Sequence, residues 1–251
     1  MAETWRALLA YTFDRLARRL DPPPPAPQQL APFFECLARL GFEPRHVIDI
    51  GANRGNWTRT ALRYYPNAFF TLFEPQSDLA SEMDDLLLPG SKIKLHNLGL
   101  GATTGEMLFT IHDRDDSCSF ALSAEDAATR GFPQIRVPVT TLDSIIASEL
   151  SAGRPTPELL KIDAEGWDLQ VLAGAPATLS EAEVVLLEAG IMNKRFENSL
   201  QAIINRMDAL GYTLFDFTDL NRTPTLKALW LVEAAFIRRG GTIDRQVNAY
   251  N

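Results

Sequence analysis

Two glycines in the first quarter of the chain stand where a nucleotide-binding turn would need them. The apolar run 47–50 leads into Gly51-Ala52-Asn53-Arg54-Gly55-Asn56-Trp57. This order predicts a buried strand, a tight turn and then a helix. Gly51 and Gly55 allow backbone angles that other residues avoid and let a ligand approach closely, and the start of the helix offers free amide groups. The segment therefore predicts a site for a nucleotide-like ligand.

An acidic residue follows at the distance that a ribose contact requires. Glu74 ends the next apolar run, 69–74, 23 residues after Gly51. A carboxylate at the end of the second strand can accept hydrogen bonds from both hydroxyls of a ribose. The alternative is a strand-end carboxylate that contacts only water.

The turn favours a ligand with a ribose and an ammonium group but no pyrophosphate. A nicotinamide site uses three glycines, G-x-G-x-x-G, and the second lets the backbone approach the pyrophosphate; here Asn53 holds that position. Asp49 would repel a pyrophosphate and attract the ammonium of an amino acid. These features favour S-adenosylmethionine (SAM) over NAD. A buried Asp49 that accepts hydrogen bonds from the turn amides is an alternative role for this residue.

The elements that position these residues alternate between apolar runs and helical stretches, which is typical of βαβ units and a mainly parallel sheet. We therefore expect an α/β, doubly wound, Rossmann-like fold. Strands are predicted near 46–50, 69–74, 92–96, 158–162 and 183–188, and helices near 28–40, 56–65, 76–88, 142–150, 166–173 and 197–210. Segment 100–140 reads as an insertion or lid with β-like stretches at 106–111 and 135–139, and 213–217 with 228–237 predicts an antiparallel hairpin.

The chain divides into a short N-terminal segment and one larger domain. Apolar residues at helical spacing over 3–20 predict an amphipathic helix, which the prolines at 22–25 must end. We expect residues 1–27 to be this helix and a proline-rich linker, and 28–251 to be the catalytic domain. The N-terminal helix either docks as a structural element or serves as an arm for contact with a membrane surface or for homo-oligomer formation.

Composition restricts the partners and the compartment. The net charge of -8 opposes a nucleic-acid partner, because such binding relies on lysine and arginine that neutralise phosphates. Two cysteines, Cys36 and Cys118, form neither a disulfide framework nor a zinc motif. The sequence has neither a signal peptide at its start nor an apolar stretch of about 18 residues. We expect a cytoplasmic protein without a transmembrane segment.

Several further segments, taken in order, are specific enough to suggest a family. They are 47–55 with the turn, Phe73-Glu74-Pro75, His96-Asn97-Leu98-Gly99-Leu100-Gly101, Val139-Thr140-Thr141-Leu142-Asp143-Ser144, and Leu160-Lys161-Ile162-Asp163-Ala164-Glu165-Gly166-Trp167 with the helix that follows. Over about residues 45 to 190 the sequence resembles the class I SAM-dependent methyltransferases, and more narrowly the FkbM family of mostly O-directed enzymes.

The resemblance implies a fold and a set of cofactor contacts. It implies a seven-stranded, mostly parallel sheet in which the C-terminal hairpin inserts one antiparallel strand. It also implies that Asp49 and the turn hold the methionine part of SAM, that Glu74 holds the ribose, and that Asn97 and Leu98 lie near the adenine. The expected cofactor-binding residues are Asp49, Gly51, Ala52, Asn53, Gly55, Asn56, Trp57, Glu74, Pro75, Asn97 and Leu98. Trp167 departs from the family, which usually has histidine there.

Methyl transfer to an alcohol also needs a group that accepts the hydroxyl proton. Asp163 and Glu188 end the fourth and fifth predicted strands, at the edge where open α/β sheets bind ligands. We rank Asp163 first as base or substrate orienter, Glu188 second and Glu165 third. Each has a structural alternative: Asp163 as a helix N-cap, Glu188 as a cofactor or loop contact, and Glu165 in a first helical turn. Asp163 and Glu188 could also hold a divalent metal such as magnesium.

The sequence therefore supports three hypotheses. The first is a SAM-dependent O-methyltransferase that acts on a hydroxyl of a small molecule, sugar or glycan. The second is an NAD-dependent oxidoreductase on a related sheet. The third is a non-catalytic module with the SAM-binding fold that serves assembly.

Overall fold

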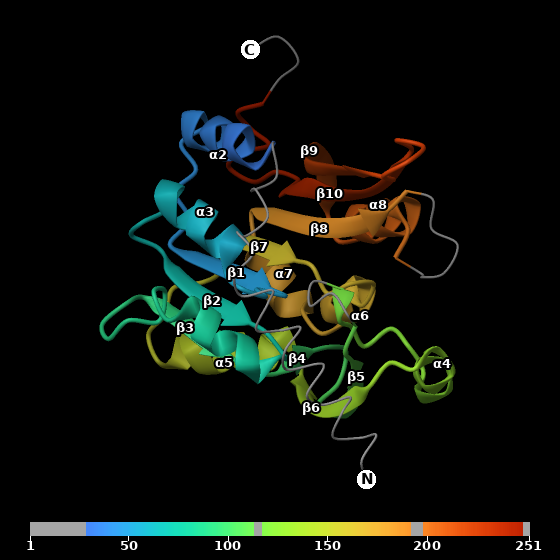
Figure 1. Cartoon of the computed structure of the whole chain (residues 1–251). Helices are drawn as coiled ribbons and strands as arrows, with labels where there is room; N and C mark the ends of the chain where they lie inside the picture. Colours follow the sequence, from blue (N-terminus) through green and yellow to red (C-terminus); the bar gives the residue numbers. More distant parts are fainter. Residues whose placement is uncertain (1–28, 113–116, 192–197, 248–251) are drawn as a thin grey trace.

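A seven-stranded sheet forms the centre of the molecule (Figure 1). The computed structural model describes residues 29–112, 117–191 and 198–247. The strand order is β3-β2-β1-β7-β8-β10-β9, in which neighbours are parallel except that β10 runs antiparallel to both β8 and β9. The strands are β1 (His46–Ile50), β2 (Phe69–Phe73), β3 (Ile93–His96), β7 (Leu159–Ile162), β8 (Val184–Gly190), β9 (Tyr212–Arg222) and β10 (Leu229–Arg238). The predicted fold class and the single antiparallel strand are confirmed.

The middle strands are mostly apolar because both faces of the sheet are covered. All residues of β1 and β7 are buried, and β1 lies between β2 and β7 in parallel register. Such strands carry continuous apolar runs rather than an alternating pattern. For this reason the strands at 46–50 and 158–162 can be recognised from the sequence.

Helices cover the two faces as separate layers (Figure 1). On one face α2 (Leu30–Arg39), α3 (Asn56–Tyr64) and the 3₁₀ helix η1 (Ser77–Met83) pack with Phe70 and Leu72 of β2. On the other face α5 (Leu142–Ser151), α6 (Asp168–Ala173), α7 (Pro176–Glu181) and α8 (Leu200–Ala209) pack with Ile48, Leu160 and Leu187. Two apolar cores therefore hold the sheet from both sides.

Three strands from the segment between β3 and α5 form a small second sheet. Its strands are β4 (Gly99–Leu100), β5 (Gly105–Thr110) and β6 (Gln134–Thr140), in the order β4-β6-β5, and α4 (Ala124–Arg130) lies between β5 and β6. Phe109, Phe120, Val137 and Val139 form a core of their own, against which Trp167 packs. The β-like stretches predicted at 106–111 and 135–139 are thus confirmed as paired strands.

One predicted helix is wrong in type and length. Residues 76–88 form only η1, because tertiary contacts hold this segment in tighter turns. Arg59 of α3 donates to both carboxylate oxygens of Asp85, at 2.9 and 2.6 Å, and to the carbonyl of Glu82 at 2.8 Å. The other helices and strands predicted in the domain agree with the structure to within three residues at their described ends, except the strand predicted at 213–217, which continues to Arg222 as β9. The elements β4, α4 and α7 were not predicted.

The predicted N-terminal helix and its proline-rich linker lie outside the described residues. Within the described ranges, no helix is both long enough and apolar enough to cross a membrane.

Asp143, which lies in α5, connects this helix to α7 by hydrogen bonds. Its carboxylate accepts from the amides of Ala177 and Thr178, at 2.9 and 2.8 Å, and from the Thr178 hydroxyl at 2.7 Å. We predict that Asp143→Ala lowers the free energy of unfolding by about 1–2 kcal/mol, because the amides at the start of α7 lose their acceptor. Urea denaturation followed by circular dichroism measures this change. Exposed Glu181, at the other end of α7, offers the control: Glu181→Ala should change stability by less than about 0.5 kcal/mol, and equal effects would contradict the assignment.

Candidate active site

A large cavity opens at the carboxyl ends of the parallel strands. Its volume is about 1210 Å³. Pockets that hold one small ligand usually enclose about 300–1,000 Å³, so this cavity has room for a cofactor and an acceptor together. Its walls come from the turn after β1, the residues after β2 and β7, the end of β8, the second sheet, and the hairpin of β9 and β10.

The turn after β1 depends on Gly51. Gly51 has a φ of 74°, and its amide and that of Ala52 both donate to the carbonyl of Phe73 at 3.0 Å. A Cβ atom at Gly51 would lie 1.9 Å from the backbone oxygen of Asp163. Only glycine therefore allows the ends of β1 and β7 to approach this closely.

Glu74 joins the turn to the end of β2. Its side chain is buried, and its two oxygens accept from the amides of Asn53 at 2.8 Å and Gln76 at 2.9 Å. Burial raises the pKa of Glu74 to about 6, although the hydrogen bonds from Gln76 and Asn53 oppose this shift. Asn97 donates to the backbone carbonyl of Glu74 at 3.1 Å. Glu74 lines the cavity and keeps acceptor capacity for a ligand, since each carboxylate oxygen has more than one lone pair.

Asp49 lies below the turn and does not line the cavity. Its side chain is fully buried, accepts from the Thr58 hydroxyl at 2.5 Å and forms an ion pair with Lys161 at 3.4 Å. These contacts differ from the alternative role, in which Asp49 would accept hydrogen bonds from the turn amides. Asp49 is thus placed to act on the turn through Lys161 and Thr58.

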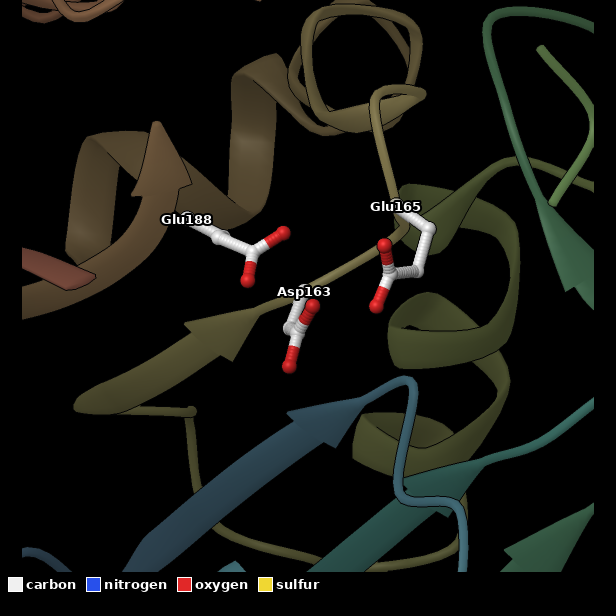
Figure 2. Close-up of side chains that lie close together, drawn as sticks. All are labelled: Asp163, Glu165 and Glu188. Atoms are coloured by element: carbon white, nitrogen blue, oxygen red, sulfur yellow. The ribbon is translucent and has the colours of Figure 1, made fainter. Parts of the chain in front are cut away.

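Three carboxylates face one another at the far side of the turn (Figure 2). Asp163, Glu165 and Glu188 each offer an oxygen within 4.8 Å of the others. Glu165 and Gly166 have φ values of 50° and 90°, and this left-handed bend after β7 turns the Glu165 side chain toward Asp163. A non-glycine residue in that region is strained, so the surrounding structure must hold it there. The N-cap of α6 is Trp167, so Asp163 does not cap that helix.

The site concentrates acidic groups at the ends of β7 and β8. Burial, together with the charges of Asp163 and Glu165, raises the pKa of Glu188 well above its ordinary value. Burial also raises the pKa of Asp168 to about 7 and that of Glu233, which faces Glu188 across β8 and β10, to about 7. Such raised proton affinities are common where side chains accept or donate protons.

The hairpin of β9 and β10 forms the remaining wall of the cavity. Trp230 and Leu220 line the cavity with side chains that are 48% and 44% exposed. The register of the two strands shifts between Leu229 and Leu231, so Trp230 occupies a β-bulge. Bulges redirect side chains at the edges of binding sites. This wall therefore contributes an aromatic side chain to the cavity that the three carboxylates also line.

The structure brings most of the predicted site residues into one cavity. The predicted residues that line it are Gly51, Ala52, Asn53, Asn56, Trp57, Glu74, Pro75, Leu98, Asp163, Glu165 and Glu188. Asp49, Gly55 and Asn97 do not line it. Gly55 supports the turn from behind, where a Cβ atom would lie 2.7 Å from Leu86.

Sequence reasoning missed several residues of the site. Glu233 stands as a lone acid in the apolar strand β10, and Lys161 as a lone base in β7; such isolated charges are the signal that could have identified them. Asp168 and the 219–224 segment of the hairpin carry no comparable signal, since acids are common in first helical turns and polar residues are common near hairpin ends.

The fold and the cavity together define a SAM-dependent methyltransferase with a Rossmann-like sheet. The sequence matches the methyltransferase FkbM domain over residues 49–214, about two thirds of the chain. The chain therefore belongs to the FkbM methyltransferase family. This membership decides against the NAD-dependent oxidoreductase.

Solved methyltransferase structures resemble the chain at low sequence identity. The O-methyltransferase TomG of Streptomyces achromogenes, involved in tomaymycin synthesis, is 13% identical with a TM-score of 0.45, over 83% of this chain and 79% of TomG. The precorrin-6y C5,15-methyltransferase of Geobacter metallireducens is 13% identical with a TM-score of 0.44, over 84% and 88%. No curated protein sequence matches this chain.

The contact between Gly51 and Asp163 yields a direct test. We predict that Gly51→Ala abolishes SAM binding, with a loss of about 100-fold or more, because the new methyl group would separate the turn from the end of β7. Isothermal titration calorimetry with SAM measures the affinity. Gly105 of β5 has open space around its Cα, so Gly105→Ala is the control and should bind SAM like the wild type. Normal binding by Gly51→Ala would show that the turn does not hold the cofactor.

Proposed function

We propose that this methyltransferase transfers the methyl group of SAM to a hydroxyl oxygen of a small molecule or of a sugar unit in a glycan. The observation that carries the proposal is the half-buried Glu188 carboxylate, which lies beside Asp163 and Glu165 in the cavity and has a raised pKa. An alcohol must lose a proton when it is methylated, and a carboxylate with a raised proton affinity can accept it. SAM, when bound, supplies the electrophilic methyl group.

The residues around the turn fit the cofactor. Gly51 leaves space for close approach of a ligand to the backbone, and Glu74 offers carboxylate oxygens at the cavity wall. In the proposed site the turn 51–57 holds the methionine part, Glu74 holds the ribose, and Pro75 and Leu98 line the adenine end. Asp49 and Asn97 act indirectly, Asp49 through Lys161 and Asn97 through the carbonyl of Glu74.

Glu188 is better suited to be the base than Asp163, which the sequence favours. Oδ2 of Asp163 lies 3.1 Å from the ammonium of Lys161, so that oxygen is already paired with a positive charge. Glu188 instead faces other carboxylates, which increase its affinity for a proton. A cation in the cavity, such as a sulfonium, would lower the pKa of Glu188 and prepare it to accept the hydroxyl proton. Asp163 then orients the hydroxyl.

The crowding of three carboxylates can be relieved by a shared proton or by a divalent cation. Among the described residues, Asp163, Glu165 and Glu188 are the group whose spacing suits a metal ion. Magnesium binds through carboxylate oxygens and keeps several water molecules. A metal-bound hydroxyl would then lose its proton more readily, and this is the second mechanism for the same reaction.

The acceptor lies on the side of the cavity that the hairpin forms. Trp230 and Leu220 offer apolar surface there, and Asp163 and Glu188 offer hydrogen-bond acceptors nearby. An acceptor with a ring and several hydroxyl groups suits this combination, because an aromatic face packs against the ring while carboxylates receive the hydroxyls.

A screen of acceptors tests the proposal. Purified protein is incubated with SAM and panels of sugars, glycosides, phenols and amines, and release of S-adenosylhomocysteine is measured together with the mass of the product. We expect turnover with hydroxyl acceptors and an oxygen-linked methyl group in the product. Each reaction is repeated with EDTA and with added magnesium; complete loss with EDTA and recovery with magnesium would establish the metal mechanism. Methylation of amines alone would refute O-methylation, and SAM binding without turnover of any panel would favour the non-catalytic module.

The base assignment predicts a change in pH dependence. With an acceptor from the screen, Glu188→Gln should lower kcat by about 10²–10⁴-fold, because the amide cannot accept the proton. In the wild type, kcat should fall as the pH decreases through the pKa that Glu188 has in the complex with SAM, since the protonated acid is inactive as a base, and this acidic limb should disappear in the variant. Glu106 of β5 is exposed and outside the cavity, so Glu106→Gln is the control. An unchanged acidic limb in Glu188→Gln would assign the base to another group.

A further inference from the structure

Lys161 is a buried lysine in the middle of the sheet. It lies on β7, between β1 and β8, and its side chain is only 6% exposed. Its ammonium donates to the carbonyl of Gly51 at 3.0 Å and forms ion pairs with Asp163 at 3.1 Å and Asp49 at 3.4 Å. An ammonium group has three protons, and here three oxygen atoms from two different strand ends surround it.

Acidic groups gather around Lys161. Five carboxyl groups on or just after five strands of the sheet interact with its ammonium electrostatically: Asp49, Glu74, Asp163, Glu188 and Glu233. These neighbours raise the pKa of Lys161 above its ordinary value despite burial, so the side chain remains an ammonium. Lys161 therefore supplies the positive charge that allows acidic groups to gather at the cavity.

Stability alone does not explain a lysine at this position. The other residues of β7 are apolar, and an apolar side chain would fit such a strand without loss of hydration. Replacing a buried ion pair by apolar residues is often neutral or stabilising. The contacts of Lys161 point instead to the turn, since it holds the carbonyl of Gly51 at the place where Gly51 meets the backbone of Asp163.

We propose that Lys161 is a positioning residue for the cofactor, because its ammonium fastens the Gly51 turn and the Asp163 carboxylate to each other in the arrangement that accepts SAM. The proposal rests on the assignment of the cavity as the SAM site. It assigns Lys161 no contact with the reacting atoms.

Removal of Lys161 alone would combine two effects. Lys161→Met leaves Asp49 buried without a counter-charge, which destabilises the fold. The double variant Lys161→Met with Asp49→Asn removes both charges of the buried pair, so part of the lost stability returns while the Gly51 carbonyl and Asp163 still lack the ammonium. A role in stability and a role in cofactor binding are therefore separable.

The test compares S-adenosylhomocysteine affinity, measured by titration calorimetry, with the thermal midpoint of unfolding. The variants are wild type, Asp49→Asn, Lys161→Met and the double variant. We expect the double variant to have a higher thermal midpoint than Lys161→Met, yet to bind about tenfold or more weakly than Asp49→Asn, because a charge-assisted hydrogen bond to the turn is lost. Lys94 of β3, a half-exposed lysine paired with Glu149 outside the cavity, gives the control: Lys94→Met should bind like the wild type.

The outcomes distinguish the proposal from its premise. If the double variant binds less than about tenfold more weakly than Asp49→Asn, Lys161 serves stability only and the proposal is wrong. If the wild type itself fails to bind S-adenosylhomocysteine, the assignment of the cavity as the SAM site fails instead.

Discussion

The close contact between the ends of β1 and β7 is the constraint on which the rest of the site depends. Gly51 packs directly on the backbone of Asp163, and this contact sets how far the turn stands from the carboxylates. The turn is further tied to β2 through the carbonyl of Phe73 and the carboxylate of Glu74. Three neighbouring parallel strands thus end in one connected surface, which is where open α/β sheets bind ligands.

The chemistry of the site follows from carboxylates placed where water is scarce. Burial alone favours the neutral form of an acid. When several acids lie near one lysine, the lysine favours their charged forms while the acids favour the neutral forms of one another, so the pKa of each depends on both effects. The positive charge of Lys161 offsets the mutual repulsion of the acidic side chains. The left-handed bend at Glu165 brings a third carboxylate to Asp163 and Glu188. A methyltransferase needs such a group only for the proton of its acceptor, because the cofactor brings the reactive methyl group.

The sequence predicts the parts of the structure that depend on local pattern. Continuous apolar runs identify β1 and β7, and the glycine spacing with Glu74 identifies the cofactor side of the cavity. The extent of η1 was not predictable, because the contacts of Arg59 with Asp85 and Glu82 decide it. The pairing of Asp49 with Lys161 also escapes prediction, since an acid before a glycine turn looks the same whether it faces a ligand or the interior, and the sequence leaves both roles open. Glu233 reaches the site only through the pairing of β10 with β8.

The two sides of the cavity are built in different ways. The proposed cofactor side consists of strand ends whose backbones are in contact, and a change there disturbs the whole sheet. The proposed acceptor side includes the outer part of the hairpin, where Trp230 sits in a bulge and Leu220 lies exposed. Side chains on this outer part can be exchanged without altering the order of strands or the turn after β1. The hairpin is accordingly the region in which a protein engineer could search for new acceptor selectivity while leaving cofactor use intact.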